Sequence, residues 1–406
     1  MVKDYADFFR RQKKFMIFGM LMMALSGPGQ TFFFSYFISD IRAEFFLTHS
    51  EFGALYSLAT LISAFLILFT GPLIDRYKLT HYVAFILIGL GFSAILLSQA
   101  KHLAVLFIGF IAARHFGQGL CMHAMGTAFG RAYDKNRGRA IAIGQTGLPI
   151  GETLFSLFIV SLLTAFDWRM SLLATGLGVL SLALPLQVFL AKSEPDSHHD
   201  QHEDNQVVSR SRREVLRDWR FYAIMLYYIG SPTLLTALFL NQASLAQERG
   251  WPLASMALAF GVYAIVKIFF SLYIGPKIDQ SSARKTLPLG VVPFVLAMVI
   301  LLVFDGDMQF FGQPVLPYIY MGFVGANVGI LSASISSLWP ELYGTAYLGA
   351  IRSLVSTITT FGTACSPFFA GLILDTRFGF DGLIWVSLVY AIVTLPPLLW
   401  AVRERV

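Results

Sequence analysis

Twelve long apolar segments constrain the fold of this chain more than any other feature of its sequence. Hydrophobic residues make up 56% of its 406 residues and charged residues only 13%, whereas a soluble domain carries about 25% charged residues. So large an apolar fraction cannot be buried inside one water-soluble core. Most of the segments reach the length of about 20 residues that an α-helix needs to cross a bilayer. We therefore predict an all-α polytopic membrane protein.

The apolar segments form two groups of six, separated by one long polar stretch. We expect an N-terminal six-helix half at residues 1–191, a cytoplasmic linker at 192–219 and a C-terminal six-helix half at 220–406. The predicted spans are residues 15–39, 52–74, 82–99, 103–130, 140–166, 170–191, 221–243, 254–276, 285–304, 314–338, 346–373 and 382–401.

The polar stretch begins acidic and rich in histidine and ends basic. Three of its histidines, His198, His199 and His202, have side chains that can bind a metal ion. A metal site needs a rigid scaffold that fixes the ligand geometry, and this stretch has none in its sequence. We interpret it as a solvated linker whose basic end lies near anionic lipid headgroups, and we predict no metal site.

A pentapeptide occurs almost twice in the chain. Gly71-Pro72-Leu73-Ile74-Asp75 returns 204 residues later as Gly275-Pro276-Lys277-Ile278-Asp279, and both copies close an apolar segment and precede cations. A repeat at half the chain length indicates two homologous halves. We interpret both copies as the same turn between helices.

The distribution of cations predicts the orientation in the membrane. With the N-terminus placed in the cytoplasm, 22 of the 30 Lys and Arg residues lie on the cytoplasmic side, five lie on the opposite side and three lie inside spans. Cytoplasmic loops of membrane proteins carry an excess of Lys and Arg. We therefore expect both termini in the cytoplasm and a location in a bacterial inner membrane. Cations placed in this way argue against nucleic acid as a partner.

Four charged residues are predicted inside the bilayer: Arg114, Glu152, Lys267 and Arg352. A charge near the midplane costs at least several kcal/mol unless it faces a partner or a wet cavity. Their excess of positive charge suits an anionic substrate, plausibly a carboxylate. The alternative for Arg114 is a structural role on helix ends or backbone carbonyls, and Arg352 lies near enough to the interface to reach headgroups.

Glu152 is the one carboxylate that we place well inside the bilayer. Burial raises the pKa of a glutamate, and a nearby arginine lowers it. A substrate anion that competes for Arg114 would therefore change the proton affinity of Glu152, which is a route to proton coupling. A permanent Arg114–Glu152 pair is the alternative.

Several motifs carry a resemblance to a known family. Gly71, Leu73, Asp75 and Arg76 match the loop motif G-x-L-x-D-[RK]-x-G-R-[RK] of the major facilitator superfamily, although its closing Gly and basic pair are replaced. Two further stretches are similar to the family's R-x-x-Q-G and R-G-R-A patterns, namely 114–119, with one residue inserted, and 137–140. The chain resembles these transporters over essentially its whole length.

This resemblance implies roles for particular residues. The two halves would be latched on the cytoplasmic side by gating residues, which are Asp75, Arg76, Asp279, Arg137 and Arg139. Polar side chains on the cavity-lining spans would contact the substrate beside the three cations, and these are Gln30, Gln118 and Asn327.

We expect a secondary transporter that works by alternating access and moves a small organic anion, coupled to protons. It would be similar to the monocarboxylate and oxalate/formate branches, and it would act as a monomer with membrane lipids as its surroundings. No cofactor and no enzymatic activity are expected, because the chain has no P-loop, dinucleotide fingerprint or nucleophile elbow. One alternative is an exporter of drugs, siderophores or other metabolites. Another is a membrane sensor or scaffold without transport.

Overall fold

The computed structural model of the protein describes residues 9–10, 12–133, 137–195, 211–304, 309–310, 313–344 and 348–403. Within these residues, twelve helical segments are long and apolar enough to cross a membrane. The prediction of an all-α polytopic membrane protein with twelve spans is confirmed. The predicted linker lies largely outside the described residues, and so do its three histidines.

The chain forms two compact units. The first contains residues 1–47 and 55–201, and the second contains 48–54 and 202–406. The short segment 48–54 begins the second span but packs within the second unit, so α5 starts in one unit and continues in the other. The division into continuous halves at residues 1–191 and 220–406 stays a prediction.

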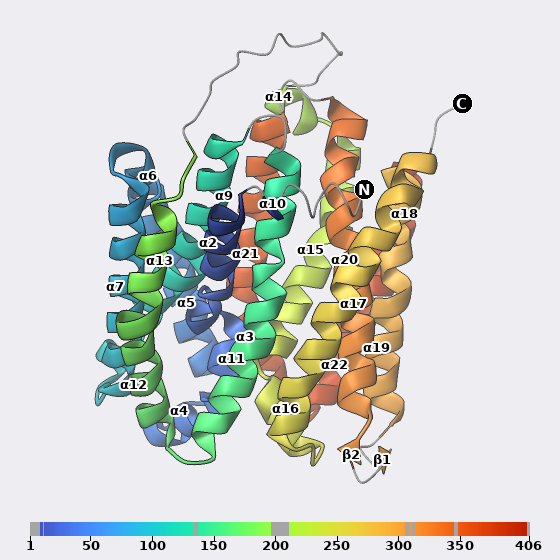
Figure 1. The fold of residues 1–406 in the computed structure, drawn as a ribbon. Helices are drawn as coiled ribbons and strands as arrows, with labels where there is room; N and C mark the ends of the chain where they lie inside the picture. The colour runs from blue at the N-terminus through green and yellow to red at the C-terminus, as the bar shows by residue number, and fades with distance from the viewer. Residues whose placement is uncertain are drawn as a thin grey trace. The chain divides into compact units, whose positions relative to one another are not determined.

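Figure 1 shows the first unit in blue and green, with α6 and α10 near one end and α4 near the other. Phe15, Phe129 and Leu87 lie in its apolar core. Its elements are α2 (Lys13–Ala24), η1 (Gly27–Gly29), α3 (Thr31–Ser35), α4 (Ile38–Phe45), α5 (His49–Thr70), α6 (Leu73–Arg76), α7 (Leu79–Ser98), α8 (Leu103–Ala113), η2 (Arg114–Cys121), α9 (Met122–Ala132), α10 (Arg137–Gln145), α11 (Gly147–Leu163), α12 (Trp168–Gly178), η3 (Val179–Ala183) and α13 (Leu184–Ala191).

The second unit runs from yellow-green to red in Figure 1. Trp339, Phe221 and Leu398 lie in its core. Its elements are α14 (Arg212–Val215), α15 (Trp219–Leu240), α16 (Gln242–Glu248), α17 (Leu253–Gln280), α18 (Ala283–Thr286), η4 (Leu287–Gly290), α19 (Val291–Val303), the paired strands β1 (Gln309–Phe310) and β2 (Gln313–Pro314), α20 (Leu316–Tyr343), α21 (Leu348–Leu374) and α22 (Gly379–Val402).

Gly27-Pro28-Gly29 in the sequence predicts a break in the first span, and the structure has that break. Here α2 ends, one turn of 3₁₀-helix follows, and α3 restarts after Gln30, whose backbone is extended. Proline has no backbone N–H to donate, so Pro28 cannot continue the hydrogen bonds of α2. The break leaves backbone groups that need other partners inside the bilayer.

Glycines bring helix backbones into contact within each unit. In the first unit, a Cβ added to Gly147 or Gly151 would overlap the backbone of Met20 or Ala24 on α2. In the second, Gly325 and Gly329 of α20 lie against the backbone of α17. Small residues spaced four apart allow this approach in membrane helices.

The two copies of the repeated pentapeptide differ in structure, which corrects the expectation of one shared turn. In the first copy, α5 ends at Thr70 and Gly71-Pro72 lead into α6. In the second copy, α17 continues through Pro276 to Gln280, and the chain turns only at Ser281-Ser282. The next helix, α18, is then capped by side chains: Ser282 Oγ accepts from Lys285 N at 3.3 Å, and a Glu341 carboxylate oxygen accepts from Ala283 N at 2.8 Å.

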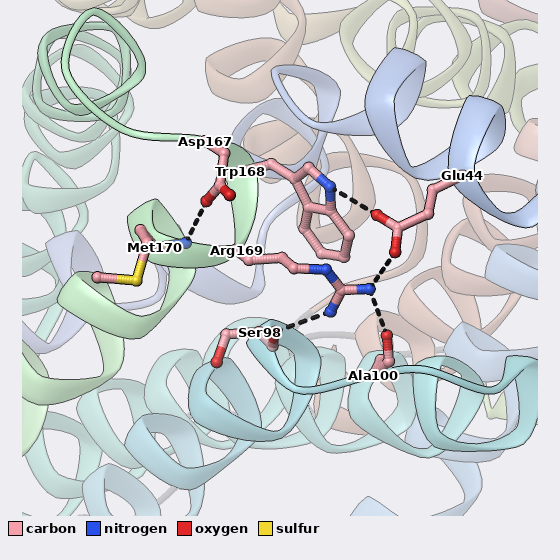
Figure 2. A network of polar contacts seen from close by, with 7 residues as sticks. All are labelled: Glu44, Ser98, Ala100, Asp167, Trp168, Arg169 and Met170. Atoms are coloured by element: carbon pink, nitrogen blue, oxygen red, sulfur yellow. Dashed lines mark hydrogen bonds and ion pairs between the residues drawn. The ribbon is translucent and has the colours of Figure 1, made fainter.

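An ion pair and a network of hydrogen bonds lie at the end of the first unit that carries α4. Figure 2 shows the Arg169 guanidinium between the Glu44 carboxylate and the carbonyls of Ser98 and Ala100, to which it donates at 2.8 and 2.6 Å. The Trp168 indole donates to the same carboxylate at 3.1 Å. The orphan carbonyls at the end of α7 are thereby satisfied by a cation, which also suits the negative pole of that helix.

Within the second unit, Asp375 caps the first turn of α5. Its carboxylate accepts from the backbone N–H groups of His49 at 3.0 Å and Ser50 at 2.8 Å. Burial raises the pKa of this carboxyl, but hydrogen bonds from Ser50 and His49 together outweigh burial and hold it below its ordinary value. Because the folded pKa is lowered, the cap contributes its full stability above about pH 4 and loses it as the pH falls through the folded pKa.

We predict that Gly147→Ala lowers the apparent melting temperature of the purified protein, because the new methyl group would overlap the Met20 carbonyl oxygen. Overpacking of this kind costs about 1–3 kcal/mol. Gly126→Ala on α9 is the matched control, since no atom lies within 4 Å of its added Cβ. Equal melting temperatures for the two variants would contradict the close contact between α11 and α2.

Candidate functional site

Arg114 lies at the start of η2, a π-helical segment inside the fourth span, and is 3% exposed. Its guanidinium donates to the Gly29 carbonyl at 3.0 Å and to the hydroxyls of Thr31 at 3.3 Å and Thr60 at 3.1 Å. The ring of Tyr56 lies 5.0 Å from the guanidinium carbon. Three acceptors and an aromatic face compensate the charge, so this environment favours the structural role.

The backbone arrangement explains how Arg114 reaches the broken first span. The backbone of Gly29 touches those of Ala113 and Gly117, so a side chain at either glycine would collide with the other helix. Single π-helical turns inside α-helices often occur at functional sites. Here the π-helical segment directs Arg114 at the carbonyl that the break leaves without an intrahelical partner. None of the hydrogen bonds that the described residues show for this guanidinium goes to Glu152.

Two other predicted substrate contacts are also used inside their units. The Gln30 amide donates to Ser26 Oγ at 3.1 Å and lies 3.5 Å from the Met122 sulfur. The Asn327 amide donates to the Gly290 carbonyl at 2.8 Å and accepts from Ser231 Oγ at 2.6 Å. Both side chains are buried, and both bonding patterns favour helix packing.

For three further residues, the predicted role in substrate binding or proton coupling stays a prediction. Gln118 is half-buried in η2. Glu152 is 8% exposed on α11. Lys267, half-buried in the middle of α17, donates to the Tyr263 hydroxyl at 3.2 Å, and its ammonium lies 5.2 Å from the centre of that ring.

Arg352 differs from these residues because it is exposed and lines a groove of 360 Å³ within the second unit. One of its terminal nitrogens donates to the Ser336 carbonyl at 3.2 Å. A guanidinium has five N–H donors, and among the described residues this bond uses one of them, so donors remain that can bind an anion. Grooves of 300–1,000 Å³ are typical of small-molecule sites.

The groove is lined by six hydroxyl groups that sequence reasoning missed. They belong to Tyr228, Ser336, Ser356, Thr359, Thr360 and Thr363. The sequence does contain a signal, because the last four recur three to four residues apart on α21. That spacing places them on one face of a helix. Apolar side chains of Trp339, Ile335 and Val355 complete the lining.

Three of these hydroxyl groups donate their hydrogen atoms to backbone carbonyls of their own helix. Ser336 donates to the Ser332 carbonyl at 2.7 Å, Thr359 to Val355 at 2.8 Å, and Thr363 to Thr360 at 3.0 Å. Their oxygens can therefore offer only acceptors to a ligand. The groove combines one cationic donor with several hydroxyl acceptors.

The predicted gating residues are placed only in part. Asp75 and Arg76 are exposed on α6. Asp279 lies in the last turn of α17, and Arg137 and Arg139 lie in the first turn of α10, but the side chains of these three are outside the described residues. The latch stays a prediction.

The comparisons with known proteins agree with the fold. The family model described as "Major Facilitator Superfamily" matches residues 19–242 and 224–406. A search of curated protein sequences finds no significant match. Among solved structures, a bacterial homolog of the human lysosomal transporter Spinster, inward-facing and unoccupied, has a TM-score of 0.71 at 13% identity and covers 97% of both chains.

A second solved structure, the nucleoside transporter NupG, has a TM-score of 0.71 at 16% identity, covering 97% of this chain and 99% of its own. Twelve candidate membrane spans and the match to the family model define a polytopic membrane protein of the transporter class. The chain belongs to the Major Facilitator Superfamily.

We predict that Arg114→Gln destabilises the protein, because the Gly29 carbonyl and both threonine hydroxyls lose a charged donor in a buried site. The loss should amount to about 2–4 kcal/mol and should appear as a lower melting temperature in detergent. Arg352→Gln serves as the control, since exposed substitutions stay within about 0.5 kcal/mol. If both variants melt together with the parent protein, Arg114 has no structural role.

Proposed function

We propose that the protein is a secondary transporter that moves a small organic anion, a carboxylate in the simplest case, by alternating access with the proton as coupling ion. The observation that carries this proposal is the exposed Arg352 guanidinium in the groove of the second unit. Arginine binds carboxylates with paired hydrogen bonds that are stronger than those between neutral groups. Alternating access is the mode of action of secondary transporters built from repeats.

The hydroxyl oxygens of the groove refine the substrate class. Ser336, Thr359 and Thr363 offer acceptors, so a ligand with donor groups beside its acid group satisfies more of the lining than a bare fatty acid does. A small hydroxylated or amine-bearing carboxylate meets both requirements. Nucleosides, which the name of the similar structure NupG gives as its substrate, share the donor groups but lack the acid.

The proposal includes the topology expected from the sequence. The termini and the turn at Gly71–Arg76 lie in the cytoplasm, and the protein acts as a monomer in a bacterial inner membrane. The 22-to-5 distribution of cations supports this orientation.

A second candidate is an exporter of amphipathic drugs, siderophores or other metabolites. It is favoured by an apolar groove of 640 Å³ between α17, α19 and α20, lined by side chains that include Phe270, Leu296 and Phe323. A lateral apolar groove in a membrane protein suits a compound that enters from the bilayer. Dye efflux from proteoliposomes without uptake of any carboxylate would select this candidate.

Arg352→Gln should weaken the binding of a carboxylate substrate and leave the binding of nucleosides unchanged. Loss of a charge-assisted pair corresponds to about a 10- to 100-fold increase in Kd, measured by ligand-induced thermal stabilisation over a panel of small acids. Arg377→Gln removes another exposed cation and should bind like the parent protein. Unchanged carboxylate affinity in Arg352→Gln would refute the proposed site.

Glu152→Gln should fold and bind substrate but lose the pH dependence of uptake, because the amide cannot exchange the coupling proton. The measurement is initial uptake into proteoliposomes at a series of pH values. Glu51→Gln, which neutralises an exposed carboxylate of α5, should keep the parent profile. A parent-like profile in Glu152→Gln would exclude this residue as the coupling group.

A further inference from the structure

His115 is a buried titratable residue that the proposed function does not use. It follows Arg114 in η2 and is 4% exposed. Its Nδ1 lies 3.3 Å from the Ser63 carbonyl oxygen, and its Nε2 lies 3.1 Å from the Thr70 hydroxyl. Ser63 and Thr70 both belong to α5, so the imidazole spans the last two turns of that helix.

The hydrogen atoms available to these groups do not satisfy all contacts when the ring is neutral. The Ser63 carbonyl can only accept, so Nδ1 carries a hydrogen and a neutral ring has only an acceptor left at Nε2. The Thr70 hydroxyl, however, also lies 3.0 Å from the Leu66 carbonyl, which can only accept as well. One hydroxyl hydrogen cannot serve both Nε2 and Leu66.

A second proton on the ring resolves this conflict. The protonated Nε2 donates to Thr70 Oγ1, and the Thr70 hydroxyl then donates to the Leu66 carbonyl. Every group has a partner in this arrangement, and the positive charge lies near the carbonyl-rich end of α5, where cations are favoured. We propose that His115 is a proton-binding site whose occupancy controls how firmly the end of α5 is held.

The end of α5 leads directly into the turn at Gly71–Arg76, and the fourth span holds that turn at two more points. His123 Nε2 lies 3.2 Å from the Gly71 carbonyl, and Arg131 donates to the Ile74 carbonyl at 3.2 Å. His115, His123 and Arg131 follow one another at intervals of eight residues. Together they form a ladder of basic side chains along α5 and the turn.

Other charged and titratable groups lie beside His115 in the chain and on the elements that contact the turn at Gly71–Arg76. Arg114, beside it in the chain, opposes a second positive charge, although its guanidinium is directed at Gly29, Thr31 and Thr60. From α7, Tyr82 donates to the Gly71 carbonyl at 3.4 Å, and the Asp75 carboxylate of α6 acts electrostatically on Tyr82. Other titratable side chains of these elements are Tyr56 of α5, whose ring lies 5.0 Å from the Arg114 guanidinium carbon, Cys121 of η2, and His123 of α9, which contacts the Gly71 carbonyl.

The proton affinity of His115 therefore depends on the position of α5. Burial and Arg114 oppose the charge, and the acceptors of α5 compensate it. A movement of α5 away from η2 removes the acceptors and leaves the opposing effects, so the proton is released. By linkage, release of the proton loosens the end of α5 to the same extent. This inference holds whichever substrate the protein carries.

Imidazole ¹⁵N NMR of the histidine-labelled protein tests the proton site directly. One resonance, absent from His115→Gln, should change from the neutral to the protonated form as the pH is lowered from about 8 to 5. Thr70→Val keeps the side-chain shape but removes the hydroxyl oxygen that accepts from the protonated His115 Nε2. This variant should therefore shift the titration of His115 to lower pH. A His115 resonance that stays neutral over this range, or that titrates identically in Thr70→Val, would overturn the inference.

Thiol labelling tests the coupling to the turn. With Cys121 and Cys365 replaced by alanine, the exposed Tyr77→Cys reports on the turn, and its labelling rate is normalised to that of a model thiol at each pH. The normalised rate should rise about fivefold, the lower end of ordinary coupling, when His115 loses its proton. His81→Gln, an exposed histidine of α7, should keep this rise, and His115→Gln should abolish it. A rise that persists in His115→Gln would refute the coupling.

Discussion

A backbone that breaks inside a bilayer must find hydrogen-bond partners within the protein, because hydrocarbon offers none. The first span breaks at Gly27-Pro28-Gly29, and Arg114 of the fourth span donates to the Gly29 carbonyl. The π-helical segment and the backbone contacts of Gly29 and Gly117 bring the guanidinium to that carbonyl. One buried cation thus stabilises a helix break that would otherwise leave a buried carbonyl without a hydrogen-bond donor.

In the second unit, a neutral side chain donates the hydrogen bond to a glycine carbonyl at a helix irregularity. Its ninth span contains a short 3₁₀ turn that follows α18 and ends at Gly290, and the amide of Asn327, from the tenth span, donates to the Gly290 carbonyl. The fourth and tenth spans occupy the same place in their six-helix groups, so the two units use equivalent helices to satisfy a glycine carbonyl. The neutral amide leaves the second unit without a buried cation at this position. Arg352 is exposed in the groove instead.

Sequence reasoning found the polar residues inside the spans but not their partners. Arg114, Gln30 and Asn327 are rare and costly in a membrane, and that cost is visible from hydropathy. The same cost is compensated by a substrate, by a wet cavity or by a backbone carbonyl, and a sequence does not distinguish these cases. The structure places all three residues on partners within their own units. The hydroxyls of α21 were missed because serine and threonine in a span usually bond to their own helix, as Thr359 does.

The sequence by itself determined the twelve spans, the family and the break in the first helix. These are local properties, set by the summed transfer energy of about 20 neighbouring residues and by the backbone limits of glycine and proline. Only the tertiary structure decided that the second G-P-x-I-D continues as helix, and which intramembrane cation is used in packing and which faces a groove. The physical reason is distance along the chain. Arg114 and Gly29 are 85 residues apart, and hydrogen-bond partners so far apart are chosen by how the helices pack.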